Sequence, residues 1–367
     1  MGNLPNIAAV KASARPLLET QLSCPPTAKR GSPQQSAQEF YENTKARIQK
    51  IQSHLANSPR GTRLKDKVCI ITGVGSLKGI GCVRVHSTFM LSYLRSDAHP
   101  PSLFAHEGAK HLYLIDFDAK NLPDLKETIE KHYPDVKATT VQGDAADEAL
   151  ISGICERALK EEGRLDVFFA NAGIASKDPL ESTTSETFMN VMRINSLSCF
   201  LAVKYASIAM KKTNESRGKS SSGGSIILTA SVAGIRSGAG TIDYSASKAA
   251  VNSIAKTSVY QLQKTNIRVN SICPGLIETG MTLATFDYAR QRGSDDKIGQ
   301  LNPLGRFGVA EEIAQAALFL GLRSVQSRDP MAVLILLLDD SSYVNGQNVA
   351  VDGGLSSSHP VVPGRWA

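Results

Sequence analysis

Long hydrophobic runs are missing from the chain. Its longest uninterrupted apolar stretch, Met331 to Leu338, has eight residues, whereas a helix needs about twenty to cross a bilayer core of roughly 30 Å. The sequence therefore predicts neither a transmembrane protein nor a membrane partner.

Cysteine is also scarce. The six cysteines in 367 residues form no Cys-x-x-Cys pair and no cluster with the spacing of metal ligands. This pattern predicts no metal site and is typical of buried thiols in a reducing compartment, so we expect a cytoplasmic protein. A mitochondrial presequence is the alternative, because Lys11 and Arg15 lie in an acid-poor stretch. Pro5 and Pro16 interrupt the helix that such a leader needs.

A uniform excess of positive charge is absent as well. The net charge is +7, but residues 1–67 hold eleven Lys/Arg against four Asp/Glu, so the rest of the chain is neutral. A nucleic-acid surface would concentrate basic residues on the folded domain, and we expect no nucleic-acid partner.

Residues 1–60 are predicted to form an N-terminal extension. Enrichment in Pro, Ser and Gln predicts disorder up to about residue 36. Phe40, Ile48 and Leu55 share one helical face and predict an amphipathic helix over 37–56.

A tyrosine, a lysine and a serine indicate a proton-transfer site. Tyr244 and Lys248 stand four residues apart, so on a helix they share one face. A neighbouring ammonium favours the phenolate form of a tyrosine, which suits a general acid or base. Ser231, thirteen residues before the tyrosine, adds a hydroxyl that can hold a substrate oxygen. Because a Tyr–Lys pair at this spacing often arises by chance, the interpretation needs a second, independent signal.

The second signal is a glycine-rich turn after a buried strand. Residues 67–72 are mostly apolar and β-branched, and four glycines follow between Thr72 and Gly81. Glycines let backbone N–H groups approach a pyrophosphate, and the N-terminus of a following helix adds positive charge. A second apolar strand, 111–115, ends in Asp116. A carboxylate there accepts hydrogen bonds from an adenosine ribose and repels a 2′-phosphate, which favours NAD over NADP. The alternative is that Asp116 only caps a helix starting near Ala119.

Other polar or small residues follow predicted strands in the same way. In chain order they are Asp144, Asn171-Ala172-Gly173, Ser231, Pro274-Gly275 and Thr279. Asp144 can accept a hydrogen bond from an adenine amino group. Open α/β sheets bind ligands at the carboxyl ends of their strands. The sequence therefore predicts a single α/β domain with a Rossmann-like, doubly wound parallel sheet of about seven strands.

In order and spacing, these motifs resemble the short-chain dehydrogenase/reductase family. The sequence as a whole resembles the fungal secondary-metabolism members of that family. The resemblance covers about Leu64 to Gly354 and rests on the glycine turn, Asp144, Asn171-Ala172-Gly173, Asn195, Ser231, Tyr244-x-x-x-Lys248, Pro274-Gly275 and Val351-Asp352-Gly353-Gly354. It implies a domain over 64–356 and leaves a tail over 357–367. It also implies an enzyme that interconverts a secondary alcohol and a ketone by hydride transfer with NAD, or alternatively NADP.

The family's residue roles carry over by position. The resemblance implies that Tyr244 is the acid/base, Ser231 orients the substrate oxygen and Lys248 holds the nicotinamide ribose. Asn195 is expected to hold a water that links Lys248 to solvent; the alternative is a helix-interior amide bonded to backbone. Thr279 is expected to contact the nicotinamide carboxamide. The expected cofactor-binding residues are Gly73, Gly79, Ile80, Gly81, Asp116, Asp144, Asn171, Ala172, Gly173, Tyr244, Lys248, Pro274, Gly275 and Thr279.

Two segments depart from the family's pattern. Residues 82–103 lengthen the chain by about twenty residues after the glycine turn, and His99-Pro100-Pro101 inside them cannot continue a helix. Residues 321–338 interrupt the chain before its last strand. Because joining the flanks restores the family pattern, we favour translated introns over genuine surface insertions. Transcripts that always contain the extra codons would contradict this hypothesis.

The substrate is encoded less directly. Three loops are expected to line its pocket: 174–184, 232–243 and 276–300, the last carrying Met281, Phe286 and Tyr288. These loops hold no tight basic cluster, so an apolar alcohol or ketone, including a cyclic one, fits better than a phosphorylated sugar.

Two other functions stay open besides alcohol–ketone interconversion, and a homo-oligomer is expected. The chain could be a Rossmann scaffold whose catalysis is impaired by the insertions, or a related dehydratase or epimerase. The resemblance implies a homodimer or homotetramer built through the helices around Asn195 and Tyr244.

Overall fold

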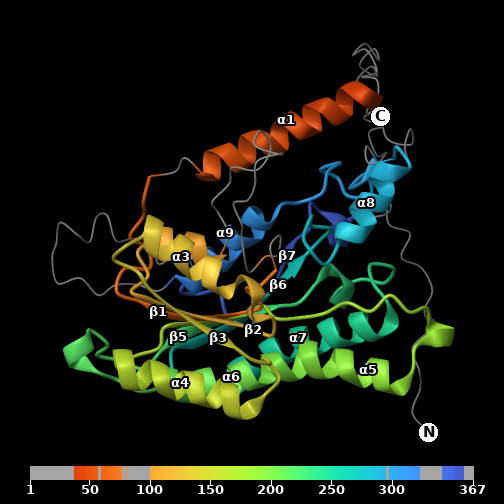
Figure 1. Cartoon of the computed structure of the whole chain (residues 1–367). Coiled ribbons are helices and arrows are strands. Elements are labelled where there is room, and N and C mark those ends of the chain that lie inside the picture. Colours follow the sequence, from red (N-terminus) through yellow and green to blue (C-terminus); the bar gives the residue numbers. More distant parts are fainter. Residues whose placement is uncertain are drawn as a thin grey trace, which may run out of the picture.

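A parallel sheet organises the chain (Figure 1). The computed structural model describes residues 37–56, 59–76, 80, 100–294, 297–322 and 341–358. Within these residues, seven strands form one sheet in the order β3-β2-β1-β4-β5-β6-β7, and every neighbouring pair is parallel. The strands are β1 (Val68–Thr72), β2 (His111–Asp116), β3 (Lys137–Gln142), β4 (Val167–Ala170), β5 (Gly224–Thr229), β6 (Ile267–Pro274) and β7 (Asn348–Val351). The order reverses between β1 and β4, which confirms the predicted doubly wound, Rossmann-like fold.

The central strands are apolar because both faces of the sheet are covered. Every residue of β1, β4 and β5 is buried, whereas the edge strands β3 and β7 are partly exposed. Continuous burial of this kind is typical of parallel sheets with helices on both sides.

Helices form a layer on each side of the sheet (Figure 1). One core cluster joins the sheet to α2 (Pro100–His106), α3 (Leu122–His132) and α9 (Ala310–Gly321). The other joins it to α4 (Glu148–Glu162), α6 (Ser198–Met210) and α7 (Ile242–Gln261), with α5 (Ser185–Met192) beside α7. No helix among the described residues is both long and apolar enough to cross a membrane.

Two further helices lie outside these layers. α1 (Ala37–Ala56) occupies the segment expected to be an amphipathic helix and lies on the α3 and α9 side of the sheet, where Ile48 is buried (Figure 1). α8 (Leu283–Gln291) follows the loop after β6.

The range predicted as the first insertion, 82–103, contains the start of a helix. Most of residues 82–103 lie outside the described residues, but α2 starts at Pro100, and Ser102 and Leu103 are buried. Prolines fit the first turn of a helix because the N–H groups there have no intrahelical partner. The two prolines therefore begin a helix inside the predicted range 82–103, and the last two residues of that range pack in the core.

Hydrogen bonds join the two segments that flank the second predicted insertion. Buried Arg268 donates from Nη2 to the carbonyl oxygens of Leu320 (2.8 Å) and Leu322 (2.6 Å), and from Nη1 to that of Val344 (3.3 Å). Ser341 Oγ also reaches Leu322 O at 3.4 Å. Residues 323–340 lie outside the described residues, and the two residues that flank them, Leu322 and Ser341, lie side by side. Leu322 is fully buried, so it packs in the core although it lies within the predicted range 321–338.

We predict that removing residues 323–338 preserves the fold. Residues 339 and 340 then connect Leu322 to Ser341, and three Cα–Cα steps of about 3.8 Å reach roughly 11 Å. Because a shorter loop also costs less closure entropy, the thermal unfolding midpoint should stay within about 3 °C of the full chain. In the control, which removes Leu322 as well, the midpoint should fall by about 5 °C or more. Equal midpoints for the two variants would contradict the role given to Leu322.

A buried histidine lies at the amino end of β2. The Nδ1 of His111 is 2.9 Å from Glu162 Oε1, its Nε2 is 2.8 Å from Thr139 Oγ1, and its ring stacks on Tyr113. Burial lowers the pKa of His111, and the hydrogen bond to Glu162 opposes this shift without reversing it. The histidine is therefore neutral in the folded protein at pH 7.

We predict that His111 makes the protein less stable below about pH 6.5. An unfolded histidine titrates near pH 6.5, so below that pH the unfolded state binds more protons than the folded state, and the free energy of unfolding falls. The loss is at most about 1.4 kcal/mol per pH unit. Urea unfolding at pH 7.5 and 5.5 should show a smaller decrease for His111→Asn, which keeps a donor toward Glu162 and does not titrate. The same decrease in both proteins would show that another group dominates.

Candidate active site

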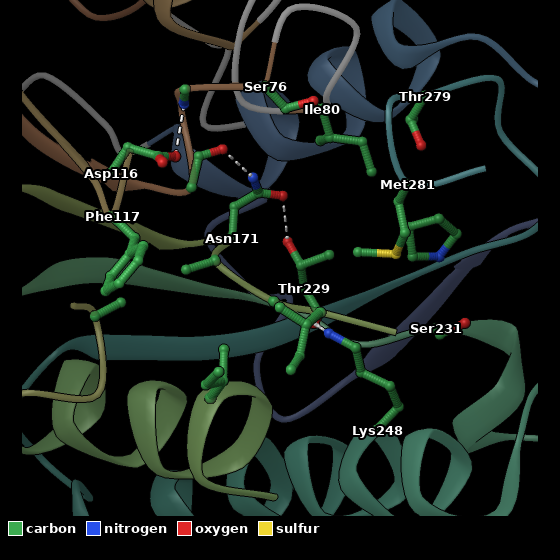
Figure 2. A pocket seen from close by; sticks show the side chains of 18 of the residues that line it. Ser76, Ile80, Asp116, Phe117, Asn171, Thr229, Ser231, Lys248, Thr279 and Met281 are labelled. Carbon is green, nitrogen blue, oxygen red and sulfur yellow. Dashed lines mark hydrogen bonds between the residues drawn. The ribbon is translucent and has the colours of Figure 1, made fainter. Parts of the chain in front are cut away.

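The candidate site is a cavity of about 810 Å³ at the carboxyl ends of the strands. Its walls come from the segments after β1 to β6, so it lies where the strand order reverses. Figure 2 shows Asp116 and Phe117 at one end, Ser231, Thr279 and Met281 at the other, and Asn171 and Thr229 between them.

The glycine turn and the end of β2 are tied to each other. Gly75 N donates to Asp116 Oδ2 at 2.6 Å, and Asp118 N donates to Oδ1 at 2.9 Å. Asp118, not Asp116, caps the 3₁₀ turn Ala119–Asn121 by accepting from Lys120 N. The helix-cap alternative for Asp116 is therefore wrong, and its carboxylate faces the cavity.

Two further contacts shape this turn. Gly73 has a φ of 72°, and a Cβ there would lie 2.7 Å from Ala172 Cα, so only glycine fits. Asn121 Nδ2 donates to Gly75 O at 2.6 Å. No pattern in the sequence points to Asn121, which lies 46 residues from its partner. Of the other predicted turn residues, Ile80 lines the cavity, whereas Gly79 and Gly81 lie outside the described residues.

Asp144 lines the cavity, but it already has partners. Its Oδ2 accepts from Arg193 Nη1 at 2.7 Å and its Oδ1 from Ala146 N at 2.8 Å. Burial raises the pKa of Asp144, but these hydrogen bonds outweigh that effect and hold the pKa below its usual value. Arg193 also lines the cavity and was not predicted, since no spacing in the sequence pairs it with a residue 49 positions away.

Asn171 joins the ends of three strands. Its Nδ2 donates to Gly73 O (3.1 Å), and its Oδ1 accepts from Thr229 Oγ1 (3.0 Å). Thr72 Oγ1 accepts from the backbone N–H groups of Asn171 and Ala172, both at 3.1 Å. These contacts fix the cavity floor through Ala172 and Gly173, which line it as expected.

The structure brings Ser231, Tyr244 and Lys248 into one cavity. Ser231 follows β5, and its Oγ accepts from Ala233 N at 3.1 Å. Tyr244 and Lys248 lie on successive turns of α7. The buried Lys248 Nζ donates to Thr229 O at 2.8 Å and lies 5.7 Å from the centre of the Tyr244 ring.

Asn195 does not line the cavity. It lies in a π-helical turn, Arg193–Leu197, between α5 and α6, and such turns are frequent at functional sites. Its Oδ1 accepts from Ile174 N (2.8 Å), and its Nδ2 donates to Ile174 O and Ser247 Oγ (both 2.9 Å). Its amide therefore fastens the loop after β4 to α7, and only one lone pair of Oδ1 is left for another donor.

The loop after β6 forms the remaining wall. Pro274, Gly275, Thr279, Met281 and Thr282 line the cavity. Thr282 Oγ1 accepts from Thr279 N at 2.9 Å and donates to Ile277 O at 2.6 Å, which holds the loop in a tight turn.

Two aromatic residues predicted to line the substrate pocket do not. Phe286 is fully buried and packs edge-to-face against Phe307 at 5.0 Å, so it belongs to the core. Tyr288 is exposed and lies under the Arg292 guanidinium. Among the described residues, no group of three or more His, Cys, Asp or Glu side chains is placed to hold a metal ion.

Comparison with known proteins identifies the family. The family model described as "Enoyl-(Acyl carrier protein) reductase" matches residues 101–328. Levodione reductase from Leifsonia aquatica is 32% identical over 308 residues, covering 83% of this chain and 99% of its own. The chain belongs to the short-chain dehydrogenase/reductase family. It is an oxidoreductase, and this family uses nicotinamide nucleotide cofactors.

Other members of the family show the same breadth of match. Short-chain dehydrogenase reductase 3c from Arabidopsis thaliana is 30% identical over 304 residues, covering 82% of this chain and 98% of its own. Cyclopentanol dehydrogenase from Comamonas testosteroni is 30% identical over 298 residues, covering 81% and 99%. The crystal structure of levodione reductase superposes with a TM-score of 0.63 at 32% identity, covering 81% of this chain and 100% of that one.

We predict that Tyr244→Phe abolishes turnover while cofactor affinity changes less than about twofold. The substitution removes only the hydroxyl, and loss of a general acid/base costs on the order of 10²–10⁴ in rate. The measurement pairs an NADH oxidation assay with an NADH fluorescence titration. Tyr260→Phe is the matched control, because Tyr260 lies on the same helix and is 76% exposed. Equal loss of binding and turnover would mean that the role of Tyr244 is misassigned.

Proposed function

We propose that the protein interconverts a secondary alcohol and a ketone on an apolar small molecule, with NAD as its preferred cofactor. The observation that carries this proposal is the convergence of Ser231, Tyr244 and Lys248 on the cavity that also contains Asp116. When bound, the nicotinamide cofactor supplies or accepts the hydride.

The remaining chemistry falls to side chains of the chain. Ser231 Oγ accepts from Ala233 N, which leaves its own hydroxyl hydrogen to donate to the substrate oxygen. Tyr244 gives a proton to that oxygen during reduction and takes it back during oxidation. The Lys248 ammonium donates one N–H to Thr229 O. Its two other N–H groups can point toward the nicotinamide ribose and toward Tyr244.

The adenosine end supports NAD over NADP. Each oxygen of Asp116 accepts one backbone N–H and keeps a lone pair for a ribose hydroxyl. Asp116, Asp118 and Asp144 line this end with Arg193, which is paired to Asp144. Among the described lining residues of this end, carboxylates outnumber cations, so an added 2′-phosphate is repelled.

The substrate end supports an apolar ligand. Ile80, Ile174, Ile277 and Met281 line the cavity, and Met281 is 49% exposed. Apolar walls with a few placed polar groups are typical of small-molecule sites. The names levodione reductase and cyclopentanol dehydrogenase, borne by relatives, make cyclic ketones and alcohols the first candidates.

An assembly through α5 and α6 accompanies this proposal. Met189, Phe200 and Ile208 on these helices are large apolar residues and 48–62% exposed. A homodimer or homotetramer would cover them, since exposed apolar patches commonly mark interfaces.

A cytoplasmic location fits the four buried cysteines of the described residues.

We predict that the purified protein oxidises NADH in the presence of a cyclic ketone and forms the corresponding alcohol. Absorbance at the NADH band and product analysis measure the two sides of the reaction. Tight NADH binding without consumption by any ketone would favour a scaffold impaired by the insertion after the glycine turn. Product formation without net NADH oxidation would favour a dehydratase or epimerase. Equal rates with NADPH would contradict the role given to the carboxylates.

A further inference from the structure

A buried polar cluster lies between α7 and β6 and contacts the turn that follows Ser231. Its centre is Asn252 of α7, which stands one turn beyond Lys248 and two turns beyond Tyr244. Its partners, Ser271 and Cys273, belong to β6 and are fully buried, while Asn252 itself is 5% exposed. None of these three residues lines the cavity.

The Asn252 amide connects α7 to the turn that carries Ser231. Its Nδ2 donates to Gly234 O at 3.2 Å, and its Oδ1 accepts from Ser271 Oγ (2.8 Å) and Cys273 Sγ (3.3 Å). Gly234 N in turn donates to Ser231 O at 3.0 Å, closing the 3₁₀ turn Val232–Gly234. Asn252 therefore bonds directly to the turn that sets the position of Ser231.

The same amide also binds a thiol of β6. The Cys273 S–H donates to Asn252 Oδ1 at 3.3 Å. Burial raises the pKa of Cys273, so the thiol keeps the hydrogen that this bond needs. Asn252 thus joins the turn after β5, through Gly234, to β6, through Cys273.

Tight packing leaves this turn little freedom. A Cβ at Gly234 would lie 2.6 Å from the Lys248 carbonyl carbon, so the turn rests directly on the backbone of α7. The hydrogen bonds of Asn252 fix the turn along the helix, while the contact at Gly234 fixes its distance from the helix. Together they set Ser231 relative to Tyr244 and Lys248, which lie on that same helix.

We propose that Asn252 is a positioning residue for the proton-transfer step: it holds the hydroxyl of Ser231 in register with Tyr244 without touching substrate or cofactor. This inference rests on the proposed function. Displacement of a catalytic group by about 1 Å is enough to cost on the order of 10²-fold in rate. Lys248 lies on the same helix, but its own hydrogen bond to Thr229 O holds its ammonium, and the other expected cofactor contacts lie on other segments. Cofactor affinity should therefore depend little on Asn252.

The test compares kcat and NADH affinity in wild type and Asn252→Ala. We expect kcat to fall on the order of 10- to 100-fold while the dissociation constant for NADH stays within about twofold. Asn252→Asp is the second variant: it keeps the size and the acceptor, but it replaces the donor toward Gly234 O by a charged carboxylate oxygen that repels that carbonyl. It should lower kcat similarly and keeps the test decisive if Asn252→Ala does not fold. Asn348→Ala is the matched control: Asn348 Oδ1 lies 2.9 Å from Ser271 Oγ, on the far side of the same cluster from Gly234. It should retain wild-type kcat.

A double-mutant cycle separates positioning from general destabilisation. If Asn252 acts through Ser231, its removal in a Ser231→Ala background should lower kcat no further. Additive losses, an unchanged kcat in a folded Asn252 variant, or an equal loss of NADH affinity would each overturn the proposal. An inactive wild-type enzyme would instead overturn the proposed function, so the two failures are distinguishable.

Discussion

Parallel pairing of all the described strands is the constraint on which the rest of the molecule depends. It brings the carboxyl end of every strand to one edge of the sheet, and it requires helices on both faces because the strands are apolar on both sides. Residues far apart in the chain therefore meet without any long-range signal between them. Asp116 and Lys248, 132 positions apart, face the same cavity for this reason.

Asparagine amides hold the segments at this edge in place. Asn171 joins the ends of β1, β4 and β5, Asn195 joins the loop after β4 to α7, and Asn252 joins α7 to the turn after β5. An amide both donates and accepts, so one side chain can bond a backbone group on one segment and a side-chain group on another, and neither is left without a partner. The loops around the cavity are fixed by hydrogen bonds as much as by apolar packing.

The parts of the fold that could be predicted from the sequence are those that depend on residues close together in the chain. Strands appear as short apolar runs, and the glycine turn and the Tyr244–Lys248 spacing are visible within a few residues. The pairing of Arg193 with Asp144 was not predictable, because it depends on how α5 and the end of β3 pack. Phe286 was misassigned for a related reason: an aromatic residue in a loop looks the same whether it faces a pocket or, as here, Phe307. Pro100 looked like an interruption, yet its missing N–H suits the first turn of α2.

Arg268 has a consequence for how this chain can vary. Its buried guanidinium donates to carbonyl groups on both sides of residues 323–340. These bonds hold the two flanking segments together. The three residues whose carbonyl groups the guanidinium binds, Leu320, Leu322 and Val344, do not line the cavity. The chain between Leu322 and Ser341 can therefore change in length while the groups that line the cavity stay in place.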